Sequence, residues 1–188
     1  GSGTTAIECE KLERNYIGFD INPQMIDYVN NLNLNNSPII KNTNSLDNSS
    51  YEFLENQKIQ FALLHPPYWD IIKFTENQND LSNSATLKDF VDKFIQICTN
   101  FLPYLENKKY FTVVIGDVYK NSEVIPLSFY LMHHIKLNFK VKLKGVIVKN
   151  IEGNRGKIGQ NNIWRYRALK SDYFIFKHEY ILVFKKES

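Results

Sequence analysis

The chain has 188 residues, 43% of them apolar and 23% charged, which suits one globular domain and excludes a disordered or coiled-coil protein. It contains neither an apolar run of about 20 residues nor an opening signal segment, so we expect a cytoplasmic protein without a membrane helix. Cys9 and Cys98 lack CxxC spacing and a neighbouring histidine cluster, which predicts neither a disulfide framework nor a metal site. Both are expected as buried apolar side chains.

The net charge of +3 hides an uneven distribution along the chain. Residues 1–135 carry 10 Lys and Arg against 16 Asp and Glu, whereas residues 136–188 carry 13 against 4. The basic part also contains Trp164, Tyr166 and Tyr173, a mixture that suits phosphate contacts and base stacking. The pattern is compatible with a polyanionic partner, although a solvated basic face is the usual outcome for a run of charges.

Short β-branched runs alternate with amphipathic stretches, which predicts an α/β fold in a single domain over residues 1–188. In chain order we expect a helix over 4–12, a strand over 16–19, a helix over 23–32, strands over 38–41 and 60–64, a polar loop over 76–84, a helix over 87–105, a strand over 110–115, a helix over 122–137, and a final strand pair over 141–148 and 180–184.

The first candidate site combines a glycine turn with an acid. The segment Gly1-Ser2-Gly3-Thr4-Thr5 precedes a predicted helix, and Asp20 ends the next predicted strand. Glycines let a backbone approach a nucleotide closely, and a carboxylate about 20 residues further on can accept hydrogen bonds from ribose hydroxyls. Asp20 as the N-cap of the helix that Pro23 opens is the alternative.

The second candidate site is His65-Pro66-Pro67-Tyr68-Trp69, directly after a predicted buried strand. Each proline fixes its own φ and forces the preceding residue into an extended conformation, so the strand ends in a rigid corner. The corner presents the His65 side chain and the Pro66 carbonyl as fixed acceptors, followed by two aromatic surfaces. A proline-rich strand end with packed aromatics is the structural alternative.

Alkylation of an exocyclic nucleobase amine needs such an arrangement. The nitrogen lone pair is delocalised into the ring, so the nitrogen is a poor nucleophile until fixed acceptors hold its hydrogens. An aromatic ring stacked on the base keeps it outside the nucleic-acid helix, where the reactive atom can be reached.

The two sites, in this order, resemble the S-adenosylmethionine-dependent DNA amino-methyltransferases, which methylate adenine N6 or cytosine N4. The family's first motif, Asp-Pro-Phe-x-Gly-Ser-Gly-Thr-Thr, is similar to residues 1–5, and residues 14–22 continue the similarity. Its catalytic motif is Asp, Asn or Ser followed by Pro-Pro-Tyr, matched here at residues 65–68, and residues 178–184 resemble its final strand. The resemblance implies a doubly wound, Rossmann-like methyltransferase sheet, mostly parallel with an antiparallel C-terminal strand.

The resemblance also implies roles for individual residues. The cofactor S-adenosylmethionine would lie on the glycine turn and on Asp20, with Asn44 or Asp47 near its adenine. His65 and the Pro66 carbonyl would hold the target amine. The full set of expected cofactor-binding residues is Gly1, Ser2, Gly3, Thr4, Asp20, Ile21 and Asn44, and the expected catalytic set is His65, Pro66, Pro67 and Tyr68.

Two departures from the family pattern bear on function. His65 stands where Asp or Asn mostly accompanies adenine and Ser cytosine, so the target base stays open, and only a neutral imidazole can accept a hydrogen bond there. The family's first strand precedes the glycine turn and lies between the strands that end at Phe19 and Leu64. We therefore expect an upstream segment or a second polypeptide to supply it, unless Gly1 and Ser2 are left over from an expression tag.

Three other features are candidates for function. Asp117 could contact the base, although capping of the next helix is favoured, and the pair His133-His134 is expected to be structural. The basic segment 150–170 is predicted to hold DNA beside the pocket. The expected nucleic-acid contacts are Trp69, Arg155, Lys157, Trp164, Arg165 and Arg167.

The sequence thus predicts a DNA methyltransferase of the kind found in restriction-modification systems, with DNA as its partner. Two alternatives are an RNA methyltransferase of the tRNA guanine-N2 type, which shares the Pro-Pro-Tyr motif, and a non-catalytic cofactor- or DNA-binding subunit of a split enzyme.

Overall fold

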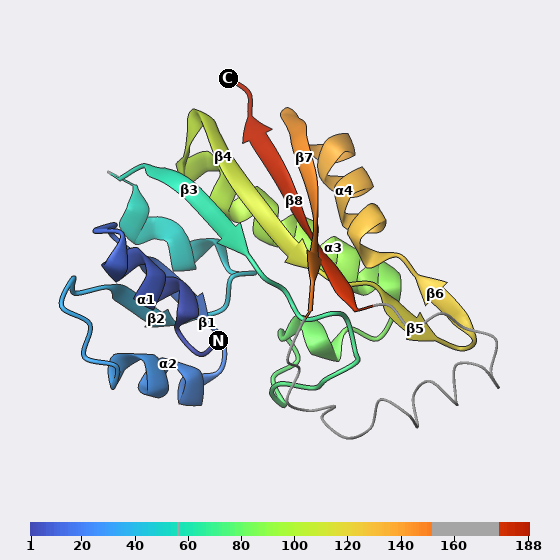
Figure 1. The fold of residues 1–188 in the computed structure, drawn as a ribbon, viewed down its shortest axis with the longest axis horizontal. Helices are drawn as coiled ribbons and strands as arrows, with labels where there is room; N and C mark the ends of the chain where they lie inside the picture. The colour runs from blue at the N-terminus through green and yellow to red at the C-terminus, as the bar shows by residue number, and fades with distance from the viewer. Residues whose placement is uncertain (56, 152–176) are drawn as a thin grey trace.

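The computed structural model describes residues 1–55, 57–151 and 177–188 (Figure 1). Its elements are α1 (Thr4–Lys11), β1 (Ile17–Asp20), α2 (Pro23–Asn30), β2 (Ile39–Asn42), η1 (Asn48–Leu54), β3 (Ile59–Leu64), η2 (Leu81–Asn83), α3 (Leu87–Phe101), η3 (Leu102–Tyr104), β4 (Leu105–Ile115), β5 (Val118–Lys120), β6 (Glu123–Ile125), α4 (Leu127–Asn138), β7 (Val141–Asn150) and β8 (His178–Lys186). The predicted alternation of helices and strands is confirmed.

The main sheet has the strand order β3-β4-β8-β7. β3 and β4 are parallel, with Leu64 opposite Val113, whereas β8 is antiparallel to both β4 and β7. Strands β3, β4 and β7 therefore run in one direction and the C-terminal strand β8 runs in the other. This confirms the expected mostly parallel sheet with an antiparallel C-terminal strand.

Strands β1 and β2 form a separate parallel pair, with Ile17 opposite Ile39. Helices α1 and α2 lie with this pair beside β3 (Figure 1). We expected a single doubly wound sheet, but within the described ranges β1 and β3 belong to different sheets. The expected strand between β1 and β3 is not tested by this arrangement.

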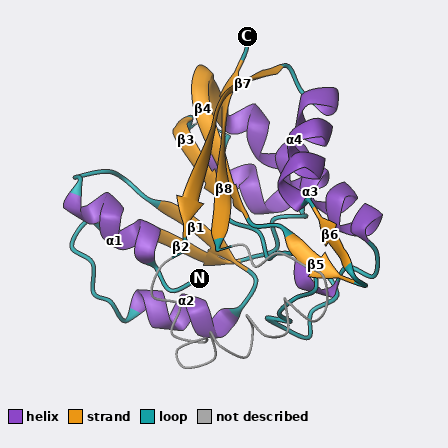
Figure 2. Cartoon of the chain, turned by 45° about the vertical axis from the view of Figure 1, so that its right-hand side comes forward, coloured by secondary structure: helices purple, strands orange, loops and turns teal. Residues whose placement is uncertain are grey.

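Helices α3 and α4 cover one face of the main sheet (Figure 2). Phe90, Phe94, Cys98 and Phe101 recur at helical spacing on α3 and are buried, because this face packs on the strands. Phe111 of β4 stacks on Phe184 of β8, with ring centroids 5.0 Å apart. This side of the sheet therefore holds the core.

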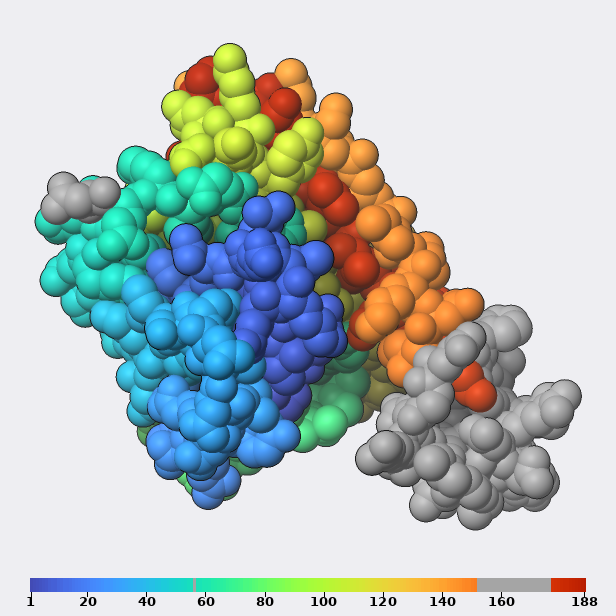
Figure 3. All heavy atoms as spheres, turned by 60° about the vertical axis from the view of Figure 1, so that its left-hand side comes forward, coloured from blue at the N-terminus to red at the C-terminus, as the bar shows by residue number. Residues whose placement is uncertain are grey.

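The opposite face of the main sheet is more open. Phe61 and Leu63 on β3 and Ile147 on β7 are 54%, 44% and 51% exposed. Seen from the side of α1, atoms of β7 and β8 (orange and red) lie at the surface (Figure 3). This face includes the end of β8 that contributes to the candidate site.

Two predicted boundaries were wrong, for local reasons. The helix expected over 122–137 begins only at Leu127, because Asn121 and Ser122 take positive φ values of 52° and 62° and form a hairpin turn between β5 and β6. The helix expected to reach residue 105 ends at Phe101, because Pro103 has no N–H to continue the α-helical hydrogen bonds, and Leu102–Tyr104 form a 3₁₀ turn instead. In the described residues no helix is both long and apolar enough to cross a membrane.

Candidate active site

The glycine turn requires glycine at Gly3. This residue is the N-cap of α1 with a φ of +77°, and an added Cβ would lie 2.9 Å from Leu32 Cδ1 and 3.0 Å from Val29 Cγ2. Both the left-handed backbone and the packing on α2 therefore exclude a side chain. The turn brings the start of α1 to the carboxyl end of β1, where the amino group of Gly1 contacts the Asp20 carboxylate.

Asp20 does not serve as the N-cap of α2. That position belongs to Asn22, whose Oδ1 accepts a hydrogen bond from the Gln24 backbone N–H at 3.0 Å. Asp20 Oδ1 accepts a hydrogen bond from the Asn22 backbone N–H at 2.9 Å, and Oδ2 points to the glycine turn. The N-cap role that the sequence left open for Asp20 thus belongs to Asn22.

The segment after β2 forms a turn close to Asp20. The Thr43 N–H donates to the Asp20 carbonyl at 3.1 Å, which holds the two strand ends together. In the turn, Asn44 Oδ1 accepts from the Leu46 N–H, and Asn44 Nδ2 donates to Asp47 Oδ2 at 3.1 Å. Both residues proposed to lie near the cofactor's adenine are therefore neighbours of each other and of the end of β1.

These residues fit S-adenosylmethionine by their chemistry. The first turn of α1 carries no acidic side chain, and its free N–H groups and helix dipole favour a carboxylate such as that of the methionine end. The Asp20 carboxylate suits ribose hydroxyls. Ser2, Thr4 and Ile21 adjoin these groups in the chain.

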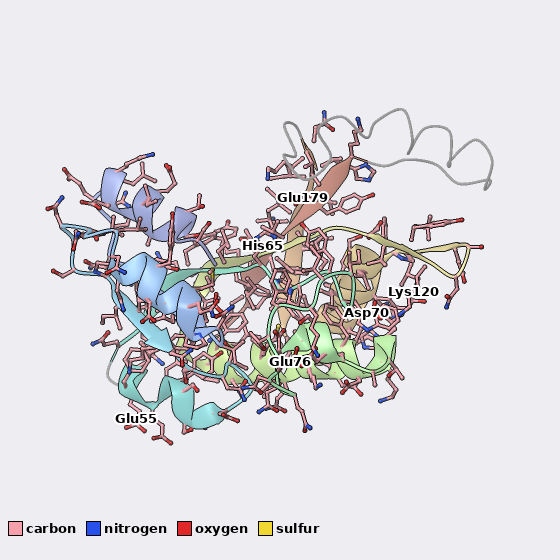
Figure 4. The ribbon with its side chains drawn as sticks, turned by 90° about the horizontal axis from the view of Figure 1, so that it is seen from below. Glu55, His65, Asp70, Glu76, Lys120 and Glu179 are labelled. Atoms are coloured by element: carbon pink, nitrogen blue, oxygen red, sulfur yellow. The ribbon has the colours of Figure 1, made fainter. Side chains whose placement is uncertain are left out.

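The His-Pro-Pro-Tyr corner follows β3 directly, as expected. Tyr68 extends across the end of β4, where the Tyr68 hydroxyl donates a hydrogen bond to the Glu179 carboxylate on β8. His65 Nε2 lies 3.4 Å from the same hydroxyl oxygen. His65 and Glu179 are neighbours in the view from below (Figure 4). Pro66 and Pro67, which lie between His65 and Tyr68 in the chain, are half-buried.

Glu179 is almost completely buried and has a second partner. Its Oε1 accepts a hydrogen bond from Lys149 Nζ at 2.5 Å, across the β7–β8 ladder in which the two residues are directly opposite. Burial alone would raise the pKa of the Glu179 carboxyl, but the hydrogen bonds from Lys149 and Tyr68 lower it below its usual value. The carboxylate is therefore ionised at neutral pH.

Partial desolvation by neighbouring groups lowers the pKa of the His65 imidazole, although the residue remains exposed to solvent. The Glu179 carboxylate opposes this shift, whereas the charges of Lys149 and of the Gly1 amino group add to it. His65 is therefore neutral at pH 7 and able to accept a hydrogen bond.

Burial and the Glu179 carboxylate raise the pKa of the Tyr68 phenol. The hydroxyl consequently keeps its proton throughout the working pH range.

Trp69 differs from the exposed stacking surface expected for a nucleic-acid contact. Its side chain is buried, its indole N–H donates to the Ser84 carbonyl at 3.0 Å, and Lys120 Nζ lies 4.2 Å from the ring centroid. Lys120 also pairs with Asp70, as seen in Figure 4. Trp69 therefore anchors the loop after the corner to the core, because its large apolar ring is shielded from water there while its N–H keeps a partner.

Asp117 caps a helix, as favoured from the sequence. Its Oδ1 accepts hydrogen bonds from the Ser128 backbone N–H and hydroxyl at 3.1 and 2.8 Å, at the start of α4. His133 and His134 lie on α4 with perpendicular rings, and the described ranges contain no group of three or more potential metal ligands. Cys98 is buried as expected, and Cys9 is only half-buried.

Sequence reasoning did not assign Glu179 or Lys149 to the site. The signal for Glu179 was an acid directly before the apolar run of the final strand. Only the strand order shows that the Glu179 carboxylate meets Tyr68. Arg155, Lys157, Trp164, Arg165 and Arg167, expected to contact DNA, lie outside the described residues.

Comparison with known proteins supports the resemblance. The family model described as DNA methylase matches residues 1–31. A search of curated proteins by sequence found no match.

Three solved structures share the fold at low identity. TTHA0409 from Thermus thermophilus, a candidate DNA modification methylase, is 13% identical with a TM-score of 0.51, over 93% of this chain and 53% of its own. The cytosine-N4-specific PvuII DNA methyltransferase is 14% identical with a TM-score of 0.52, over 72% of this chain and 46% of its own. An rRNA methylase from Streptococcus thermophilus is 8% identical with a TM-score of 0.55, over 100% of this chain and 82% of its own.

The chain thus spans about half the length of the two DNA methylase structures it matches. At identities this low the structural similarity shows a common fold and no more. The nucleic-acid substrates in the names of these structures are those of the proteins named. The chain has a methyltransferase fold whose residues 1–31 carry the signature of the DNA methylase family, which confirms the resemblance found in its sequence and supports S-adenosylmethionine as its cofactor.

Proposed function

We propose that the chain transfers a methyl group from S-adenosylmethionine to the exocyclic amine of adenine (N6) or cytosine (N4) in DNA. The observation that carries this proposal is the His-Pro-Pro-Tyr corner at the carboxyl end of β3, with a neutral, exposed His65, in a chain whose residues 1–31 match the DNA methylase family model. The cofactor, when bound, supplies an activated methyl group on a sulfonium.

The protein's own residues contribute orientation and hydrogen bonding. The glycine turn and Asp20 hold the donor, while His65 and the Pro66 carbonyl accept the amine hydrogens and Tyr68 stacks on the base. Pro66 and Pro67 fix these acceptors before the base arrives, so little entropy is lost on binding. Orientation of this kind contributes about 7 to 11 kcal/mol in favourable cases.

An RNA substrate is the second candidate, because an rRNA methylase shares the fold over the whole chain. A third candidate is a non-catalytic subunit in which His65 replaces the usual acid or amide. These alternatives differ in what is methylated and in whether His65 matters.

A labelled-methyl assay on DNA and on RNA discriminates among the three. We expect transfer to DNA by the wild type, about 100-fold less by His65→Ala, and no loss by His133→Ala, a histidine on α4 that serves as the matched control. Transfer to RNA alone would establish the second candidate. Equal rates for the wild type and His65→Ala would remove His65 from the mechanism.

We also propose that an additional strand lies between β1 and β3. The edge of β3 opposite β4 has no strand partner among the described pairings, and Phe61 beside it is 54% exposed. An additional strand between β3 and β1 would join the two sheets and shield this edge. Hydrogen exchange of the β3 amides in the full-length protein tests this, since fast exchange along that edge would contradict it.

We propose that segment 150–170 contacts DNA. Replacement of Arg165 and Arg167 by Ala should weaken DNA binding and reduce its salt dependence, because each phosphate contact releases counterions. Unchanged affinity across salt concentrations would remove this role.

A further inference from the structure

Tyr68 reaches Glu179 across the end of β4 because Gly116 leaves room for it. The β4–β8 ladder ends with Ile115 opposite Tyr180, and Gly116 and Glu179 are the residues next to this last pair. A Cβ at Gly116 would lie 2.6 Å from Cε2 of the Tyr68 ring. The Tyr68 ring therefore lies over Gly116, which has no side chain to block it. Its hydroxyl reaches the Glu179 carboxylate on β8, two strands away from β3 in the sheet.

The hydroxyl proton of Tyr68 is donated to one acceptor, the Glu179 carboxylate. A phenol has one O–H, and Tyr68 donates it to the ionised Glu179 carboxylate, which can only accept. The carboxylate is the stronger acceptor, since charge-assisted hydrogen bonds are about twice as strong as neutral ones. Toward His65, the Tyr68 oxygen can then offer only a lone pair.

This constraint decides which nitrogen of His65 carries its proton. His65 Nε2 lies 3.4 Å from the Tyr68 oxygen, and a contact with an oxygen that only accepts requires Nε2 to be the donor. A neutral imidazole with its proton on Nε2 has its free lone pair on Nδ1.

We propose that Glu179 is a positioning residue that, through Tyr68, fixes His65 in the Nε2–H tautomer and so makes Nδ1 the acceptor for the target amine. The assignment of the amine to Nδ1 rests on the proposed function, whereas the tautomer itself is a property of the free protein. Lys149 completes the arrangement by keeping the Glu179 carboxylate ionised.

The test is a measurement of the His65 tautomer by two-bond ¹H–¹⁵N correlation on histidine-labelled protein, with the resonance identified in a His65→Gln sample. We expect the Nε2–H form in the wild type. In Glu179→Ala the Tyr68 hydroxyl loses its acceptor and turns to His65, so the Nδ1–H form should become the major one. Lys149→Ala, which keeps both Glu179 and Tyr68, should retain the Nε2–H form.

A titration of His65 in the same samples gives a second, independent readout. The Glu179 carboxylate raises and the Lys149 ammonium lowers the pKa of His65, so the two alanine variants should shift it in opposite directions. If Glu179→Ala does not fold, the wild-type tautomer still decides the matter, because the proposal requires the Nε2–H form.

An Nδ1–H tautomer in the wild type, or the same tautomer in the wild type and in folded Glu179→Ala, would overturn the proposal. Neither readout requires methyl transfer. Failure of the methylation assay with the expected tautomer would therefore reject the proposed function and leave the role of Glu179 in place.

Discussion

The Tyr68 ring lies directly against the backbone of Gly116, so closely that a methyl group at Gly116 would fall 2.6 Å from ring atom Cε2 and 3.0 Å from Cδ2. The His-Pro-Pro-Tyr corner after β3 therefore packs against the end of β4 only because Gly116 has no side chain.

Gly116→Ala should displace the Tyr68 ring from Glu179 and lower methyl transfer by about tenfold or more, since about 1.4 kcal/mol of lost orientation corresponds to that factor. Gly145→Ala on β7 is the matched control, because its Cβ would meet only Val183 atoms at 3.9 and 4.0 Å. Comparison of the two rates at equal folded fraction checks this. Full activity of Gly116→Ala would show that the position of Tyr68 is unimportant.

Methyl transfer should fall as the pH is lowered, because protonated His65 has no lone pair for the target amine. Partial burial lowers the pKa of His65, so the fall should be centred below the reference value of about 6.5. His65→Asn, whose amide oxygen accepts without titrating, should lack this inflection. A flat wild-type profile between about pH 5 and 8 would count against the role.

The lowered pKa of His65 also has a consequence for stability. The unfolded chain binds the proton more readily than the folded one, so stability is present above about pH 6.5 and decreases as the pH falls through the folded pKa. Denaturant unfolding of the wild type and His65→Asn over this range should show a shallower pH dependence in the variant. Identical slopes for the two proteins would mean that His65 contributes nothing to it.

Asp20→Ala should weaken S-adenosylmethionine binding by about 10- to 100-fold, since hydrogen bonds to a charged group contribute about 1.5 to 3 kcal/mol. Asp27→Ala, an exposed acid on α2, controls for the change in net charge. Calorimetric titration of the cofactor checks both variants. Similar affinities would move the ribose site away from the end of β1.

Thr86→Ala should destabilise the fold by about 1 kcal/mol without touching the site, because Thr86 Oγ1 accepts a hydrogen bond from the Asp89 N–H at the start of α3. The Asp89 carboxylate accepts one from the Ala85 N–H in return. Thr86→Ser keeps the hydroxyl and should retain most of the stability in thermal unfolding. Equal losses in the two variants would exclude the cap as the cause.

The two cysteines should react with a thiol reagent at very different rates. Cys98 is fully buried in the core, and burial raises the pKa of its thiol, whereas Cys9 is only half-buried on α1. One thiol should therefore react in the native protein and the second only on unfolding. Two equally fast thiols would contradict the packing of α3.

Local sequence was sufficient for most of the elements and for the two motifs. Hydrophobic periodicity placed α3 and β4, and Pro23 and Gly3 marked helix starts, because these signals act through the backbone of the residues that carry them. The hairpin turn at Asn121 and Ser122 was missed because neither residue is a glycine, although both take positive φ. Family resemblance added the antiparallel direction of the C-terminal strand, which the main sheet confirmed.

The sequence by itself determined that a glycine turn, an acid and a proline-stiffened His-Pro-Pro-Tyr corner follow one another along the chain. Tertiary structure alone decided that Trp69 packs inward and that Glu179 meets Tyr68 over Gly116. The reason is physical: a residue's chemistry and backbone preference are local, whereas the partner of a side chain 111 positions away depends on strand order and register.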